Sequence, residues 1–163
     1  MPDVYGTNGG FSTYHTERGR DVSDYTSGEI DAALVVASEW LDAQYRADFM
    51  GYKTGGQDQV RDWPRIGAWD VYGYAIADDT IPTAVINATY ELALRELQSP
   101  GAMSVDYTPS KYTSVSIDGA LSVRYADRSA SDVQKQFPIV AEIMSVLIDS
   151  GGRSNLSGAS YRA

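Results

Sequence analysis

The sequence of 163 residues contains no cysteine and a single histidine, His15. Without cysteine, disulfides, thiolate nucleophiles and cysteine metal sites are excluded. With one histidine, a zinc site built from several imidazoles is excluded as well. His15 lies near the chain start between polar residues, and no partner motif of a catalytic triad accompanies it. We therefore interpret it as a plain surface residue.

Nucleotide and hydrolase motifs are also lacking. There is no Gly-x-x-x-x-Gly-Lys-Ser/Thr loop and no Gly-x-Ser-x-Gly elbow. The adjacent acids Asp78 and Asp79 are a candidate metal pair, but acids at this position also favour the positive end of a following helix. We predict no catalytic residue, no cofactor and no metal. The chain is not expected to be an enzyme, and carboxylate chemistry is the one route left open to that alternative.

Long apolar runs are missing too. No run approaches the roughly 18 to 20 residues that span a bilayer. The first residues lack the basic flank and the apolar stretch of a signal peptide. We expect no membrane partner.

Positive charge is scarce, and the formal net charge is -9. Residues 21–100 hold 14 acids and 5 bases, whereas residues 151–163 hold two arginines and no acid. Cations supply most of the affinity of proteins for nucleic acid, so this balance argues against tight DNA binding. The excess of acids either serves solubility alone or forms a surface that lies near DNA without binding it.

Apolar spacing predicts a first long helix that starts after Thr26 and ends near Phe49. Thr26 and Glu29 have the spacing of a capping box. Apolar residues then recur at steps of three and four, which is the pattern of an amphipathic helix. Asp42 is expected on the opposite, solvent-facing side together with Asp31 and Glu39.

Two further helices have similar patterns. One starts at Ile81-Pro82, because proline is favoured in a first helical turn, and it ends before Pro100. The other covers residues 137–149 and ends at two glycines. A short helix is expected from Ser12 to Arg18.

Residues 50–80 form a long glycine-containing connection that is rich in aromatic side chains: Tyr52, Trp63, Trp69, Tyr72 and Tyr74. Such a loop is usually functional or held by its own side chains. Aromatics in it suit the stacking of bases or sugars, but they also suit attachment of the loop to the core. We favour attachment to the core.

Residues 112–125 predict a β-hairpin with Asp118-Gly119 as a two-residue type I′ turn. Alternation places Val115, Ile117, Leu121 and Val123 on one apolar side. An isolated hairpin is marginally stable in water, so we expect this one to pack on a partner subunit.

The predicted fold class is mainly α: a small helical bundle with a long aromatic loop, a protruding hairpin and extended N- and C-terminal arms. Residues 1–13 are the expected N-terminal arm, and residues 14–150 are the expected helical domain. Residues 151–163 have the composition of a flexible linker and form the expected C-terminal tail.

Several segments in order resemble a known family. They are the helix around Trp40–Tyr45, the loop motif Trp63–Gly67, the start Ile81–Val85, and Tyr90–Ala93, followed by the hairpin and an apolar helix. Over residues 11–149 the chain resembles the head–tail adaptor proteins of long-tailed bacteriophages. Similar chains also carry the label of DnaT-like single-stranded-DNA-binding proteins, and we keep that function as the alternative.

The resemblance implies a structural subunit of the virion neck, synthesised in the host cytoplasm. Such proteins form a ring, usually dodecameric, below the portal protein. The ring extends the channel for genomic double-stranded DNA, which passes without sequence-specific binding, and it offers a platform for a downstream neck or tail-completion protein. The implied portal-binding residues in the tail are Arg153, Leu156, Tyr161 and Arg162. The expected contacts between subunits are Trp63, Tyr72, Val115, Ile117, Leu121 and Val123.

Overall fold

The computed structural model describes residues 3–104, 114–117, 121–124 and 137–148. Within these ranges the protein is mainly α-helical, with one antiparallel hairpin and one very short strand pair, so the predicted fold class is confirmed. The helices are α1 (Asn8–Thr16), α2 (Ser27–Tyr45), α3 (Thr83–Gln98) and α4 (Pro138–Met144). The strands are β1 (Tyr52–Lys53) paired with β2 (Arg65–Ile66), and β3 (Ser114–Ile117) paired with β4 (Leu121–Arg124); a 3-10 turn, η1, covers Gly56–Asp58.

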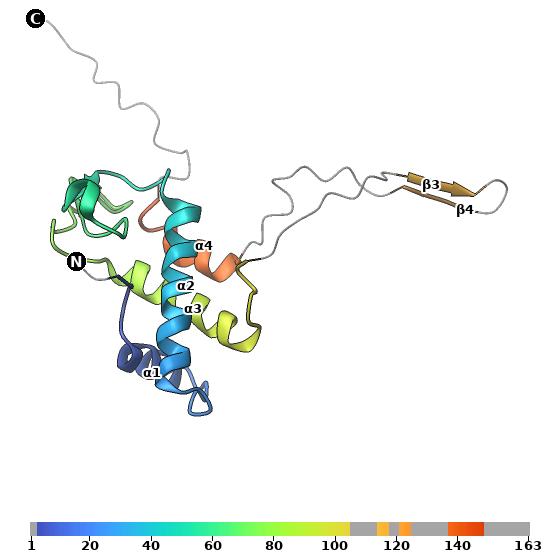
Figure 1. The fold of residues 1–163 in the computed structure, drawn as a ribbon. Helices are drawn as coiled ribbons and strands as arrows, with labels where there is room; N and C mark the ends of the chain where they lie inside the picture. The colour runs from blue at the N-terminus through green and yellow to red at the C-terminus, as the bar shows by residue number, and fades with distance from the viewer. Residues whose placement is uncertain (1–2, 105–113, 118–120, 125–136, 149–163) are drawn as a thin grey trace, which may run out of the picture.

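The two long helices form the centre of the bundle. α3 crosses behind α2, and α4 packs against α3 beside the upper half of α2 (Figure 1). α1 lies at the lower end, where it contacts both α2 and α3. The side chains between the long helices are apolar, and Leu34, Leu41 and Leu92 are almost fully buried. Each such leucine stabilises the fold by about 1.5–3 kcal/mol relative to an exposed one.

The start of α2 confirms the predicted capping box. The Glu29 backbone N–H donates to Thr26 Oγ1 over 3.3 Å, and the Thr26 N–H donates to Glu29 Oε2 over 2.8 Å. Two of the four otherwise unpaired N–H donors at the helix start are thereby satisfied. The prediction that Asp42 faces solvent is wrong, because this side chain is 2% exposed.

The predicted N-terminal arm is also wrong in part, because α1 begins at Asn8 and residues before it are packed. Thr7 Oγ1 caps the helix by accepting the Gly10 N–H over 3.0 Å. Tyr5 and Phe11 have no exposed surface. A side chain on Gly10 would overlap the Tyr90 hydroxyl, so glycine here allows α1 to approach α3.

His15 lies in the core and not on the surface as predicted. Its Nε2 lies 3.1 Å from the Tyr90 carbonyl oxygen, which can only accept, so Nε2 carries the proton. Its Nδ1 then accepts from Arg20 over 3.4 Å. The Phe11 and Tyr14 rings pack edge-on against the imidazole. Burial lowers the pKa of His15, and the neutral form is the one that this environment holds.

α4 ends at Met144, earlier than the predicted helix over residues 137–149. After the helix, the Val146 carbonyl accepts the Val71 N–H over 2.9 Å, and Ile148 forms a β-bridge with Phe49. These bonds to the loop replace further helical bonds. The segment after α4 therefore fastens the loop of residues 50–80 to the helical body.

The predicted hairpin is present in its described strands. Val115 pairs with Val123, and Ile117 pairs with Leu121. The predicted turn at Asp118-Gly119 lies outside the described residues. β3 and β4 contact each other but none of the four helices, and Figure 1 shows them apart from the bundle.

In the part of the chain that the structure describes, no helix combines the length and the apolarity that crossing a membrane requires.

We predict that His15 makes the free energy of unfolding fall as the pH is lowered from about 7 to about 5. The unfolded chain gains a proton near the ordinary histidine pKa of about 6.5, whereas the folded chain, whose pKa is lowered, does not. Urea unfolding across this range should show the fall for the natural chain. The variant His15→Gln should be less stable but should lack this part of the slope. Parallel stability curves for the two proteins would contradict the assignment.

Candidate interaction surface on an anchored loop

The loop of residues 50–80 is attached to the body through Trp63. This side chain is 1% exposed, and its ring packs edge-on against Phe49 with 5.6 Å between centroids. The Trp63–Pro64 peptide bond is cis. We predicted Trp63 at a contact between subunits, but its burial inside its own chain leaves no surface for such a contact.

A buried hydrogen-bond network joins this loop to the N-terminal segment and to α2. The Tyr5 hydroxyl donates to Asp42 Oδ1 over 2.5 Å and accepts the Trp63 backbone N–H over 3.0 Å. The Asp62 backbone N–H lies 3.4 Å from Asp42 Oδ2. One phenol and one carboxylate thus connect three segments that are far apart in the sequence.

Cations surround the two buried carboxylates of this network. Arg61 lies 3.7 Å from Asp42, while Arg46 and Lys53 lie 2.8 Å and 3.3 Å from the Asp62 carboxylate. Removing the buried Arg61 would leave the buried Asp42 carboxylate without its cation, which is far more destabilising than losing a surface pair.

Arg65 fastens the turn after α2. Its guanidinium donates to the Met50 carbonyl over 2.7 Å and to the Gly51 carbonyl over 2.5 Å. A guanidinium offers five donors in a rigid fork, so one side chain can hold several carbonyl groups in place.

Tyr5, Asp42 and Asp62, at the centre of this network, are buried, and burial changes the pKa values of Tyr5 and Asp42. Burial raises the pKa of Asp42, even though the Tyr5 hydrogen bond and the Arg61 charge act in the opposite direction. Burial, together with the neighbouring Asp42, raises the pKa of Tyr5 far above its ordinary value, so Tyr5 remains the donor. The described ranges contain no group of three or more His, Asp or Glu side chains placed to hold a metal. The hydrogen bonds of Tyr5 and Asp42 to the backbone of Asp62 and Trp63 position the loop.

A second ionic cluster lies around the buried Glu91 of α3. Arg20 lies 2.9 Å and Arg95 lies 3.2 Å from its carboxylate, and the Tyr14 hydroxyl donates to it over 3.2 Å. Burial alone would raise the pKa of Glu91, but the two arginines outweigh it and lower the pKa. The carboxylate therefore stays charged and links α1, α3 and the segment between α1 and α2.

Each of the seven lysine and arginine side chains in residues 3–104 is engaged within the chain. Apart from the two clusters, Arg18 donates to the Tyr14 carbonyl over 2.9 Å and lies over the Tyr14 ring, 3.5 Å from its centroid. Described acids outside the clusters include Asp58, Asp78 and Asp79, which lie on the exposed surface of the loop. The described surface of the loop is therefore acidic.

Most of the loop's aromatic rings point away from the core. Tyr52 is 64% exposed, Trp69 is 50%, Tyr72 is 73% and Tyr74 is 72%. Attachment to the core, which we favoured for all five aromatics, is confirmed for Trp63 and wrong for these four. Clustered exposed aromatics are typical of binding surfaces.

Three of the exposed rings belong to a rigid turn, residues 69–75, which we call the aromatic turn. Asp70 Oδ1 accepts the N–H groups of Tyr72 and Tyr74, each over 2.9 Å, and the Asp70 N–H donates to the Tyr74 carbonyl over 2.9 Å. A bridge between Trp69 and Ala75 closes the turn. The rings are therefore presented by a preorganised backbone, which lowers the entropic cost of binding.

The other predicted site residues are Tyr72, the four hairpin positions and the tail. Tyr72 is exposed and available for contact, and the four hairpin positions lie opposite one another in the register given above. The predicted tail residues lie outside the described residues. The carboxylates and the guanidinium of the buried network were missed as a set, although Asp42 and Arg65 lie within motifs that carried the family resemblance.

We predict that Tyr5→Phe lowers the free energy of unfolding by about 2–6 kcal/mol. The substitution removes one hydroxyl and leaves two buried polar groups, Asp42 Oδ1 and the Trp63 N–H, without that partner, at about 1–3 kcal/mol each. Urea unfolding measures the change. Tyr72→Phe is the matched control, because it removes a hydroxyl from an exposed ring and should leave stability unchanged. Equal stability of the two variants would refute the role of Tyr5.

Comparison with known proteins finds one family whose model matches residues 3–163, described as "Putative DnaT-like ssDNA binding protein". Searches of curated proteins and of solved structures found no match. Because the family model covers nearly the whole chain, the protein belongs to this DnaT-like family.

Proposed function

We propose that this protein is a non-catalytic adaptor subunit of a tailed bacteriophage, and that it forms a ring below the portal protein. The ring extends the DNA channel and provides the attachment platform for neck or tail-completion proteins. The observation that carries the proposal is the combination of an acidic surface with a rigid, exposed aromatic turn. The ordered series of motifs that resembles the adaptor family supports it.

The charge distribution suits a wall past which DNA moves. Protein–DNA affinity depends on cations that replace the counterions of phosphates. The arginines and lysines of residues 3–104 are committed to Glu91, Asp42, Asp62, Glu39, backbone carbonyls or an aromatic ring. A subunit of this kind repels the polyanion at short range and does not slow its passage.

The exposed aromatic rings suit protein contacts. Tyrosine and tryptophan are enriched at the centres of protein interfaces, where they bury a large area at low cost in side-chain entropy. The hairpin gives similar support, because its strands contact no helix of the described chain and a two-stranded hairpin is marginal alone. Neighbouring subunits of a ring would cover both the exposed aromatic rings and the hairpin.

Single-stranded-DNA binding is the second candidate function, and two observations favour it. The family description names this activity, and Tyr52, Trp69, Tyr72 and Tyr74 are exposed as base-stacking side chains are in such proteins. Binding of this kind also uses a positively charged groove along the backbone. The acidic loop surface is the reason for ranking this candidate second.

Imaging of assembled phage particles tests the adaptor proposal. We expect the chain as a ring between the portal and the tail. Deletion of residues 151–163 should leave a folded subunit that attaches weakly to the portal, because this segment has a linker composition and two arginines that suit an acidic partner. Circular dichroism of the truncated chain controls for folding. A natural chain found as a monomer outside the neck would overturn the proposal, and normal necks with the truncated chain would overturn the role of the tail.

Titration with a fluorescent single-stranded oligonucleotide at physiological salt separates the two functions. We expect no binding below about 1 µM, since non-specific affinities without a cationic groove lie in the micromolar range or weaker. Trp69→Ala and Tyr72→Ala remove exposed rings, and Tyr52→Phe keeps its ring as the matched control. Submicromolar binding that the first two variants lose and the control retains would favour the DNA-binding function.

A further inference from the structure

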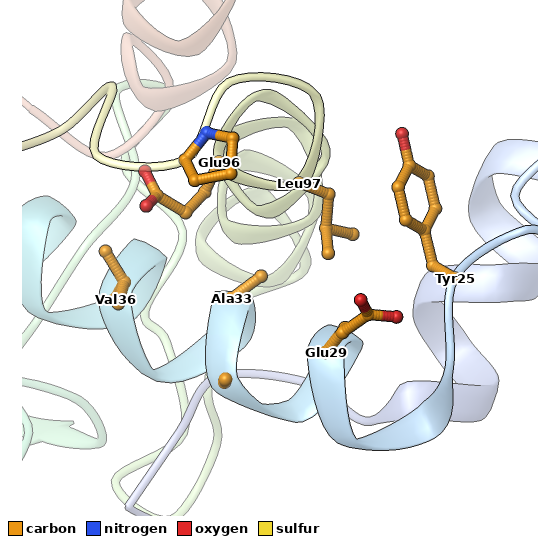
Figure 2. A pocket seen from close by; sticks show the side chains of 8 residues that line it. Tyr25, Glu29, Ala33, Val36, Glu96 and Leu97 are labelled. Atoms are coloured by element: carbon orange, nitrogen blue, oxygen red, sulfur yellow. The ribbon is translucent and has the colours of Figure 1, made fainter.

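An apolar groove lies between α2 and α3, and it is a second exposed surface besides the aromatic turn. It has a volume of about 250 Å³, and its lining includes Tyr25, Ala32, Val36 and Leu97. Figure 2 shows Ala33 on α2 facing Leu97 on α3, with Val36 nearer to Glu96 and the Tyr25 ring at the other side. No other described element fills this space, which is large enough to take aromatic side chains.

Two glutamates lie at the edge of the groove. Glu29 belongs to the capping box of α2, and Glu96 accepts the Gly101 N–H over 2.6 Å at the end of α3. A carboxylate has about four acceptor positions, so both keep the capacity to accept further hydrogen bonds. The groove thus offers an apolar floor with acceptors at its rim.

The aromatic turn has the complementary chemistry. The Trp69 indole donates through Nε1–H, and the Tyr72 and Tyr74 hydroxyls also donate, each at the end of an apolar ring. The one acid of the turn, Asp70, already has Oδ1 engaged by two backbone N–H groups. Apolar rings with donor tips fit an apolar floor with acceptor edges.

The turn and the groove lie at opposite ends of α2. The turn is tied through Val71 to Val146, beside the bridge of Ile148 with Phe49 just after α2 ends. The groove is lined by residues of the first half of α2, from Glu29 to Val36. A helix of 19 residues spans about 28 Å. In Figure 1 the green segment before α3 and the yellow end of α3 lie on opposite sides of α2.

We propose that the aromatic turn of one copy of this chain docks in the α2–α3 groove of the next copy. Each subunit then offers one turn and one groove at opposite ends, which is a head-to-tail interface that closes into a ring when the rotation per subunit allows it. The inference rests on the proposed ring function and names the surfaces that build the ring.

The acidity of both surfaces gives this interface an unusual salt dependence. Asp70 on the turn approaches Glu29 and Glu96 of the neighbour, and salt screens repulsion between exposed charges. Association should therefore strengthen as salt is added. Binding of DNA through counterion release would weaken under the same change.

Engineered cysteines test the interface directly, because the natural chain has none. We expect that Tyr74→Cys and Ala32→Cys, each oxidised alone with a mild thiol oxidant, form no disulfide-linked dimer, whereas their mixture does. A chain carrying both substitutions should give a ladder of higher oligomers. Non-reducing gels and intact mass measure the products. Glu17→Cys mixed with Ala32→Cys is the matched control, since Glu17 is exposed at the end of α1, and it should give no dimer.

A second set of variants works without crosslinking. Tyr72→Ser with Tyr74→Ser removes two rings from the turn, and Ala32→Trp fills the groove from an exposed position. Both should lower the average mass in sedimentation at high salt while circular dichroism stays unchanged.

The outcomes separate this inference from the proposed function. Rings in the particle, together with no mixed dimer and unchanged sedimentation of the variants, would overturn the turn-and-groove interface and leave the adaptor function standing. A crosslink of Ala32→Cys to Leu156→Cys in place of Tyr74→Cys would assign the groove to the tail and also overturn it. Particles without any ring of this chain would overturn the proposed function itself.

Discussion

The rest of the structure depends on the hydrogen bond between the Tyr5 hydroxyl and Asp42, and on the buried charges around it. Burying the carboxylates of Asp42 and Asp62 is costly unless they are paired and hydrogen-bonded. The chain satisfies them with a phenol from the N-terminal segment and with cations from α2 and the loop. Because these partners come from three segments, the long loop is held in one place without regular secondary structure. The aromatic turn is rigid for the same reason.

The fold was predictable where local signals decide it. The capping box at Thr26 placed the start of α2, and the alternation of Val115 to Val123 placed the hairpin. Prediction failed where tertiary contacts override local preference. Gly9 and Gly10 argue against a helix, yet α1 contains both, because only glycine at position 10 lets the helix approach Tyr90. α4 ends early because Val146 hydrogen-bonds to the loop.

The sequence predicted that the candidate site lies in the loop of residues 50–80, but it did not predict which side chains of the loop are exposed. Composition identified the aromatic residues of the loop, yet nothing local separates Trp63, which is buried, from Trp69, which is half exposed. The turn that begins at Trp69 is held by Asp70, whose Oδ1 accepts two backbone N–H groups. That contact is known only from the folded structure. Asp42 is a similar case. Its place on the helix suggested solvent, and its burial is compensated by Tyr5, which is 37 positions away.

The internal pairing of cations also constrains how this protein can recognise anything else. Since the arginines and lysines of residues 3–104 stabilise the fold, they are not available to attract a polyanion, and the surface of these residues keeps the acids that remain. Recognition by those surfaces must then rely on apolar area and on neutral hydrogen-bond donors. Tyrosine and tryptophan supply both at once. The ring that we propose would therefore leave its acidic side chains free to face DNA, because apolar and neutral hydrogen-bonding contacts between its subunits would not neutralise them.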